Sequence, residues 1–281
     1  MRIVTSSELL QKEIARIKRS GKLIGFVPTM GYLHEGHLSL IRRARHDCDF
    51  VVVSIFVNPL QFGPREDLDK YPRDLNRDVA LCRKYTDILF LPYLQSMYPK
   101  DFSTSVEVKK LGDVLCGASR PGHFKGVATV VNKLFNIVLP DAAYFGQKDV
   151  QQAIIIERMV KDLNMPVKIK VLPTVREPDG LAMSSRNSYL NPRERIDAVV
   201  LHKSLLLAQD LVRKGNINCK KIVHKMKKLI LEAKTARIDY ISIVCPETLS
   251  PLKEISSQAL VLLAVFIGRT RLIDNLVIKR R

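Results

Sequence analysis

The sequence predicts an α/β protein built on a parallel β-sheet with helices on both faces, followed by a smaller α+β domain. Between residues 22 and 175, short apolar runs alternate with stretches of helical periodicity, the pattern of repeated β-α-β units. After residue 175 the order changes to two amphipathic helices followed by strand-like runs. Residues 173–180 contain two prolines and a glycine, which mark the boundary between the two patterns.

Each expected element has its own stretch of sequence. In the first region, strands are expected at 23–28, 50–56, 88–91, 142–145 and 167–171, and helices at 36–48, 74–85, 125–139 and 149–163. In the second, helices are expected at 192–214 and 218–234, and strands at 238–244, 260–267 and 272–273. Ligands of such folds bind at the carboxyl ends of the parallel strands. The loops 28–37, 57–73 and 145–149 are therefore expected to face a ligand.

Length and composition narrow the class of protein. A chain of 281 residues that is 46% hydrophobic can bury one substantial core. It contains no apolar run of 18 residues, so no membrane span is expected. The amino-terminal residues lack the apolar core of a signal peptide, which predicts a cytoplasmic protein. The five cysteines are odd in number and widely spaced, so neither a disulfide framework nor a zinc site is predicted.

The chain is strongly basic, with 46 Lys and Arg against 28 Asp and Glu and a formal charge of +18. Such a charge suits either a nucleic-acid surface or anionic small molecules. Much of the excess has the spacing of a solvated helix face, as at Lys220, Lys221 and Lys225, and no stacking aromatics interleave it. We therefore favour a solvated basic face over nucleic-acid binding.

Two histidines, His34 and His37, flank Gly36 directly after the first expected strand of this region. The N-terminus of a helix that follows a strand is a common phosphate site, and Gly36 opens the backbone amides to a ligand. A metal pair would need a third ligand at suitable spacing, and only Glu35 is close in sequence. Helix capping by one histidine is the structural alternative.

Neutral amides follow the second expected strand, at Asn58 and Gln61. Amides offer both donors and acceptors, which suits them to hold hydroxyl and carboxyl groups. For Asn58, which precedes Pro59, formation of a turn is an equally good interpretation. Farther along, the carboxylates among residues 67–78 include candidates for holding hydrated Mg²⁺.

Two later segments carry donors for phosphate. Lys148 follows the strand expected at 142–145 and can reach a phosphate as a mobile point charge, while Asp149 is placed to cap the next helix. Ser184, Ser185 and Arg186 supply several donors within one turn. A serine-rich linker is the alternative for this second segment.

A third cationic segment contains Arg120, His123 and Lys125 in a glycine-rich turn. Its side chains can face anions, but such a turn on its own is more often part of the surface.

The pair His34 and His37 and the segment 183–186, about 150 residues apart, resemble the HIGH and KMSKS signatures of nucleotidyltransferases that activate carboxylates with ATP. In that chemistry a carboxylate attacks the α-phosphate and pyrophosphate leaves. The developing charge is stabilised by histidine, lysine, arginine and Mg²⁺.

Within that superfamily, the chain resembles the pantothenate synthetase (pantoate–β-alanine ligase) family over nearly its whole length. The resemblance is carried, in order, by PTMGYLHEGH, FVNPLQFG with DLDKYPR, RPGHFKGVATVVNKLFN, YFGQKD with the following QQ, REPDGLAMSSRN and GRTRLIDN. It implies that ATP and pantoate form pantoyl adenylate and pyrophosphate, and that β-alanine then releases AMP and pantothenate. It also implies Mg²⁺ and a cytoplasmic homodimer. A Rossmann-like nucleotide- and pantoate-binding domain would span 1–175, and a C-terminal α+β lid domain 176–281.

The resemblance also implies roles for particular residues. Those implied at the ATP site are Met30, Gly31, Tyr32, Leu33, His34, Glu35, Gly36, His37, Gly146, Gln147, Lys148, Asp149, Val175, Met183, Ser184, Ser185 and Arg186. Among them His37, His34, Lys148 and Arg186 would act in catalysis, with His37 the donor to the reacting phosphate. Gln61 and Gln152 would hold pantoate, with Gln61 also near β-alanine. Asn58 is a further candidate for substrate binding because its amide offers both donors and acceptors. Asp78 is similar to the family's metal-proximal carboxylate.

Two positions depart from the family pattern. Tyr32 stands where the family has a small residue, and Cys245 where an acidic residue is usual. Two other functions remain open from the sequence. One is a related nucleotidyltransferase that adenylates another small acid or a phosphate ester. The other is a basic nucleic-acid-binding protein that retains an inactive nucleotide fold.

Overall fold

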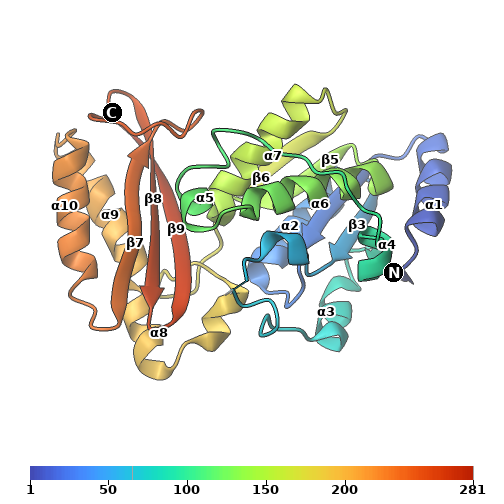
Figure 1. Cartoon of the computed structure of the whole chain (residues 1–281), viewed down its shortest axis with the longest axis horizontal. Coiled ribbons are helices and arrows are strands. Elements are labelled where there is room, and N and C mark those ends of the chain that lie inside the picture. The colour runs from blue at the N-terminus through green and yellow to red at the C-terminus, as the bar shows by residue number, and fades with distance from the viewer. Residues whose placement is uncertain (65, 281) are drawn as a thin grey trace. The chain divides into compact units, whose positions relative to one another are not determined.

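The computed structural model describes residues 1–64 and 66–280, and these form two compact units (Figure 1). The first contains residues 1–112, 120–147 and 151–173. The second contains residues 174–281 together with two short segments from earlier in the chain, 113–119 and 148–150. The functional division at residue 175 stays a prediction.

The first unit is built on a six-stranded sheet in which every pair of neighbouring strands is parallel. Its strands are β1 (Arg2–Val4), β2 (Ile24–Thr29), β3 (Phe50–Ile55), β4 (Ile88–Phe90), β5 (Ala142–Gly146) and β6 (Lys168–Leu172), in the spatial order β1-β4-β3-β2-β5-β6. This confirms the predicted parallel sheet. The strand order reverses at β2, which lies between β3 and β5. The ends of these three strands mark the ligand edge of such a sheet.

Helices cover both faces of this sheet because its central strands are apolar on both sides. The helices of this part of the chain are α1 (Ser7–Arg19), α2 (Glu35–Asp47), α3 (Leu75–Cys82), α4 (Leu94–Met97), α6 (His123–Val138) and α7 (Val150–Asp162), with short turns η1 (Pro59–Gln61) and η2 (Gln147–Asp149). Phe26 packs into the core formed with α1 and α6, and its neighbour Val27 packs into the core formed with α2. Successive side chains of β2 point to opposite faces of the sheet and thus contribute to two separate cores.

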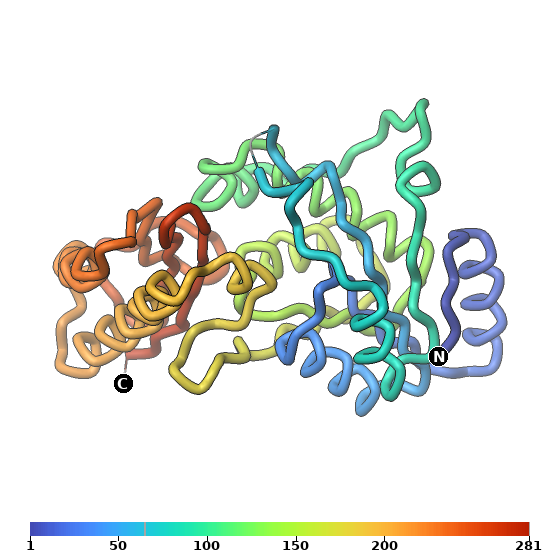
Figure 2. The backbone as a smooth tube through the Cα atoms, turned by 90° about the horizontal axis from the view of Figure 1, so that it is seen from below, coloured from blue at the N-terminus to red at the C-terminus, as the bar shows by residue number. Residues whose placement is uncertain are grey.

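The second unit contains the smaller antiparallel sheet that the sequence predicts. Its strands β7 (Ala236–Val244), β8 (Gln258–Ile267) and β9 (Thr270–Lys279) pair in that order. Its helical segments are α5 (Cys116–Ser119), η3 (Ser185–Tyr189), α8 (Pro192–Ala198), α9 (Val200–Arg213) and α10 (Cys219–Ile230). Helices α9 and α10 pack side by side against one face of the sheet, as two perpendicular views show (Figures 1 and 2). Leu205 and Met226 belong to the same buried core as Val261 and Leu263.

Several elements differ from expectation. The amino-terminal strand β1 and the short helices α4 and α5 were not expected, the helix expected at 192–214 divides at Val199, and the last strand is far longer than 272–273. Within residues 1–64 and 66–280, no helix is both long and apolar enough to cross a membrane.

Candidate active site

The two histidines form a reciprocal cap at the start of α2. His34 is the N-cap, and its Nδ1 accepts the backbone N–H of Gly36 at 3.1 Å. The Nδ1 of His37 accepts the backbone N–H of His34 at 3.3 Å, and the ring centroids lie 4.1 Å apart. Because each Nδ1 accepts, a neutral ring carries its hydrogen on Nε2. The capping role and the donor role, alternatives in the sequence, are therefore compatible in one arrangement.

The loop between β2 and α2 is held by a distant carboxylate. Asp78 accepts the backbone N–H groups of Tyr32 and Leu33, each at 2.7 Å and each on a different oxygen. Gly31 adopts a φ of 83°, and a Cβ there would come within 2.9 Å of the Cγ2 of Ile55. Tyr32 also has a positive φ, 51°. The loop conformation therefore needs both a glycine and Asp78.

Asp78 is only 2% exposed, and burial raises the pKa of its carboxyl while the two backbone N–H bonds oppose that rise. Each of its two oxygens accepts one backbone N–H of the loop. In the part of the chain that the structure describes, no group of three or more His, Cys, Asp and Glu side chains could hold a metal ion. The metal contact expected of Asp78 stays a prediction. Sequence reasoning missed its role in holding the loop.

Gln61 lies at the carboxyl ends of β2 and β3, where Asn58 holds its side chain. The Nδ2 of Asn58 donates to the Oε1 of Gln61 and to the carbonyl of Gly126, both at 3.1 Å, and its Oδ1 accepts the Tyr98 hydroxyl at 2.8 Å. The Nε2 of Gln61 points at the Sδ of Met30, 2.9 Å away. Thioether sulfur is a weak acceptor, so a carboxylate can take over this donor.

Asn58 itself is 1% exposed, and it also caps turn η1 by accepting the backbone N–H of Leu60. The turn-forming role considered for it in the sequence is therefore present. Its direct contact with substrate stays a prediction, and the geometry favours an action through Gln61.

The main chain of Gln61 is fixed from a segment that sequence reasoning placed at the surface. Its carbonyl accepts His123 Nδ1 at 2.8 Å and Arg120 Nη2 at 3.2 Å. Arg120 also donates to the Nε2 of His123 at 3.1 Å and to Glu66 at 2.7 Å. This cluster corrects the surface-turn interpretation for Arg120 and His123. Their role in fixing Gln61 becomes visible only through this contact, which joins residues about 60 positions apart in the chain.

Helix α6 approaches turn η1 very closely at Gly126. A Cβ at this position would lie 2.2 Å from the carbonyl oxygen of Leu60. No side chain fits there, so the helix and the turn that ends at Gln61 pack main chain against main chain.

The two glutamines at the start of α7 have different surroundings. Gln151 is 4% exposed and donates to the carbonyl of Leu111 at 2.9 Å, whereas Gln152 is half-buried. Binding of pantoate by Gln152 stays a prediction.

Other expected site residues lie in the second unit. The side chain of Lys148 is 20% exposed, with Nζ 3.6 Å from Asp149. The backbone N–H of Met183 donates to the carbonyl of Val175 at 3.0 Å, and Ser184 Oγ accepts the N–H of Arg186 at 3.3 Å. The segment 175–186 is thus an ordered hairpin-like loop, not a linker.

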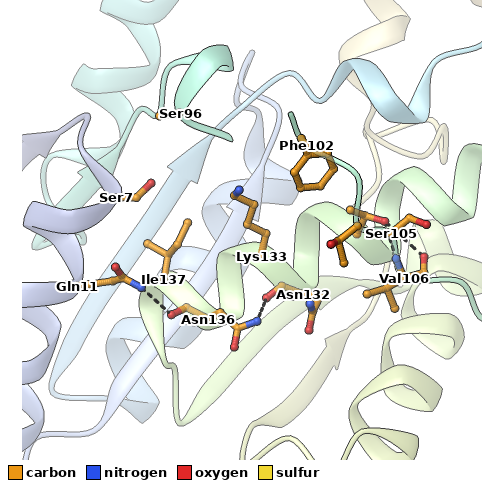
Figure 3. Close-up of a pocket in the computed structure, with 12 residues that line it drawn as sticks. Ser7, Gln11, Ser96, Phe102, Ser105, Val106, Asn132, Lys133, Asn136 and Ile137 are labelled. Atoms are coloured by element: carbon orange, nitrogen blue, oxygen red, sulfur yellow. Dashed lines mark hydrogen bonds between the residues drawn. The ribbon is translucent and has the colours of Figure 1, made fainter. Parts of the chain in front are cut away.

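A separate hollow of about 360 Å³ lies among α1, α4 and α6 of the first unit (Figure 3). The ammonium of Lys133 lies 5.1 Å from the ring centroid of Phe102, and Gln11 donates to the carbonyl of Asn136, which also lines the hollow. None of the residues expected to bind ATP, pantoate or β-alanine lines this hollow.

Comparison with known proteins identifies relatives along the whole chain. A family model described as pantoate-beta-alanine ligase matches residues 2–277. The pantothenate synthetase of Caldicellulosiruptor saccharolyticus is 57% identical over 267 residues, 95% of each chain. That of Thermosipho africanus is 55% identical over 279 residues, 99% of this chain and all of the relative.

Solved structures agree in fold. The crystal structure of pantothenate synthetase from Thermus thermophilus superposes with a TM-score of 0.93 at 47% identity, covering 98% of this chain and 99% of that one. A pantoate-beta-alanine ligase from Francisella tularensis, complexed with beta-gamma ATP and beta-alanine, gives a TM-score of 0.81 at 36% identity, over 99% and 97% of the two chains.

Proposed function

The chain belongs to the pantoate–β-alanine ligase family, and from that premise we propose how its own residues carry out the reaction. The reaction is the ATP-dependent condensation of pantoate with β-alanine, which gives pantothenate, AMP and pyrophosphate through a pantoyl-adenylate intermediate. One observation carries the residue assignments. Met30 leads into the histidine cap of α2 and also contacts the Nε2 of Gln61, so a donor set for phosphate and a donor for a carboxylate share one sheet edge.

The histidine cap supplies the phosphate donors of the first unit. The Nε2–H groups of His34 and His37, with the helix N-terminus at Glu35 and Gly36, favour negative charge. His37 donates to the reacting phosphate, where charge grows as pyrophosphate leaves. The nucleotide site is also lined by the loop residues Met30, Gly31, Tyr32 and Leu33.

The second unit contributes further cationic and hydroxyl donors. Lys148 and Arg186 act on the phosphates, Ser184 and Ser185 add hydroxyls, and the Val175 main chain meets the adenine. Gly146, Gln147, Asp149 and Met183 complete the nucleotide contacts. These assignments rest on the resemblance and on the order of the 175–186 loop.

Pantoate is held by the Nε2 of Gln61 and by Gln152, with Asn58 behind Gln61. The pantoate carboxylate oxygen attacks the α-phosphorus, an O–P bond forms, and pyrophosphate leaves. The neutral amine of β-alanine, near Gln61, then attacks the acyl carbon. The C–N bond forms, the bond to AMP breaks, and the amine loses a proton.

Mg²⁺ enters this proposal as the counter-ion of the ATP phosphates. Each oxygen of Asp78 already accepts a backbone N–H, so we assign this carboxylate first to holding the loop, and its contact with the ion stays a prediction. Every step is therefore assigned to the donors of the chain.

We also propose the domain roles that the resemblance implies. Residues 1–175 bind nucleotide and pantoate, and residues 176–281 act as a lid that keeps water from the adenylate. The enzyme works as a homodimer in the cytoplasm and does not bind nucleic acid. Protection of residues 175–190 from protease by ATP with pantoate would support the lid, whereas unchanged cleavage would contradict it. Sedimentation would test the dimer.

The decisive test is pantoate-dependent exchange of labelled pyrophosphate into ATP without β-alanine. We expect exchange with pantoate and none without an acid. Folded protein that gives no exchange would refute the proposed function. Equal exchange with a panel of other small acids would instead favour a different nucleotidyltransferase. Adding β-alanine should release AMP and pantothenate in equal amounts.

A further inference from the structure

Two neighbouring polar residues on β9, Asp274 and Asn275, are almost completely buried, at 3% and 2% exposure. They pair with Leu263 and Leu262 of the apolar strand β8. Successive side chains of a strand point to opposite faces of the sheet. A buried polar pair in such a strand is costly unless each member is hydrogen-bonded, so the partners of the two side chains explain their presence.

Asn275 holds the main chain at Lys148. Its Nδ2 donates to the carbonyl of Lys148 at 3.0 Å, across 127 residues of sequence. Its own backbone N–H donates to the Oδ1 of Asp274 at 2.8 Å. Residues 148–150 belong to the same compact unit as β9. The only cation of the YFGQKD motif is therefore attached to the C-terminal sheet through its main chain.

Asp274 holds the other ATP segment of this unit. Its two oxygens accept Nη1 and Nη2 of Arg176 at 2.6 and 3.0 Å. Arg176 also donates to the carbonyl of Gly180 and forms a β-bridge with Ala182. Ala182 directly precedes the segment 183–186. One dipeptide of β9 thus holds both the Lys148 corner and the base of the serine loop.

We propose that Asn275 is a positioning residue for adenylate formation, which acts by fixing the main chain from which Lys148 reaches the phosphates. The proposal rests on the proposed function of Lys148. A lysine side chain is long and flexible, so the position of its main chain limits where the ammonium can be held. A displacement of about 1 Å at a reacting group can lower a rate about 100-fold.

The test uses Asn275→Ala and Asn275→Leu, the second of which keeps much of the volume without a donor. We expect kcat for pantoate-dependent pyrophosphate exchange to fall about 10- to 100-fold. The KM for pantoate should change less than twofold, because Gln61 is untouched. Asn216→Ala is the matched control, since Asn216 also donates to a main-chain carbonyl, that of Leu211 at 3.3 Å. Its exchange rate should equal that of the wild type.

A double-mutant cycle separates positioning from loss of fold. Adding Asn275→Ala to Lys148→Ala should lower exchange no further than Lys148→Ala alone, because the residue acts through Lys148. Wild-type exchange in both Asn275 variants, or effects that multiply in the double mutant, would overturn the proposal. A general loss of packing would appear as multiplied effects together with an altered KM for pantoate. Absence of exchange in the wild type would refute the function itself, which is a different result.

Discussion

The side-chain amide of Asn58 donates to the side-chain carbonyl of Gln61 across 3.1 Å. This bond fixes which end of the Gln61 amide presents N–H groups toward Met30. Under the proposed role of Gln61, recognition of pantoate would therefore depend on Asn58, a residue that is itself buried.

Asn58→Ala should raise the KM for pantoate about 10-fold, by losing an orienting hydrogen bond worth about 1 kcal/mol or more. It should also lower the free energy of unfolding by about 1–3 kcal/mol, because the Tyr98 hydroxyl and the N–H of Leu60 lose a buried acceptor. Steady-state kinetics and urea denaturation measure the two effects. The control is Asn136→Ala, an exposed amide that donates to the carbonyl of Asn132. An unchanged KM for pantoate in Asn58→Ala would contradict the proposal that Asn58 orients the Gln61 side chain.

His34→Asn separates capping from phosphate donation. Asn is a favoured N-cap and can accept the Gly36 N–H as His34 Nδ1 does, but it carries no equivalent of the Nε2–H donor. We expect wild-type stability with loss of donation from this ring, whereas His34→Ala should also lose about 1 kcal/mol of stability. Thermal unfolding and pyrophosphate exchange together distinguish the variants. Full exchange in His34→Asn would confine His34 to capping.

His37→Ala removes the donor assigned to the reacting phosphate. Loss of one such donor costs about 10²- to 10³-fold in kcat, and exchange kinetics should show this without a comparable rise in the KM for pantoate. A smaller loss than in His34→Asn would reverse the order of importance that we assign to the two rings.

Asp78→Asn should loosen the loop at Tyr32 and Leu33, because each N–H bonds a different carboxylate oxygen and the amide replaces one of these acceptors with an NH₂ donor. We expect weaker ATP binding by calorimetry and a loss of about 1–3 kcal/mol in the free energy of unfolding. The Mg²⁺ concentration that gives half-maximal exchange should stay the same. A large increase in that concentration would show that Asp78 is a metal ligand after all. Asp74→Asn is the matched control, since Asp74 caps α3 by accepting the N–H of Arg77, a role that Asn also fills.

Acid stability should depend on Asp47. A hydrogen bond from His46, with further bonds from Arg43 and Tyr144, lowers the pKa of this carboxyl to about 2. A lowered pKa adds stability above the unfolded value of about 3.9, and this stability is lost as the pH falls toward about 2. The wild type should therefore lose more thermal stability between pH 4 and pH 2 than Asp47→Asn. Parallel curves for the two proteins would contradict this.

The sequence was sufficient for elements that have a strong local pattern. The apolar run that became β2 and the helical spacing after His34 predicted the strand-to-helix corner. Strand β1 was missed because three residues are too few for a pattern. Strand β9 was expected to be short because Asp274 and Asn275 interrupt its apolar residues, and those two residues are the ones with distant partners.

The residues that support the site from behind were harder to predict than the residues expected to contact the substrates. Asp78 acts on a loop 45 residues away, and Asn275 acts on Lys148 across 127 residues. Partners so far apart in the chain produce no local spacing pattern in the sequence by which they could be recognised. His34, by contrast, is a partner of the helix that it begins, so its two candidate roles could both be named in advance.

The close approach at Gly126 bears on redesign of the enzyme for other acids. A single methyl group there would sit 2.2 Å from an oxygen of the turn that ends at Gln61, so the helix and the turn cannot be brought closer or offset without a collision. Room for a bulkier acid would have to come from trimming Met30 or Gln61 itself. Libraries that leave residue 126 as glycine and vary those two side chains should yield more active variants than libraries that include it.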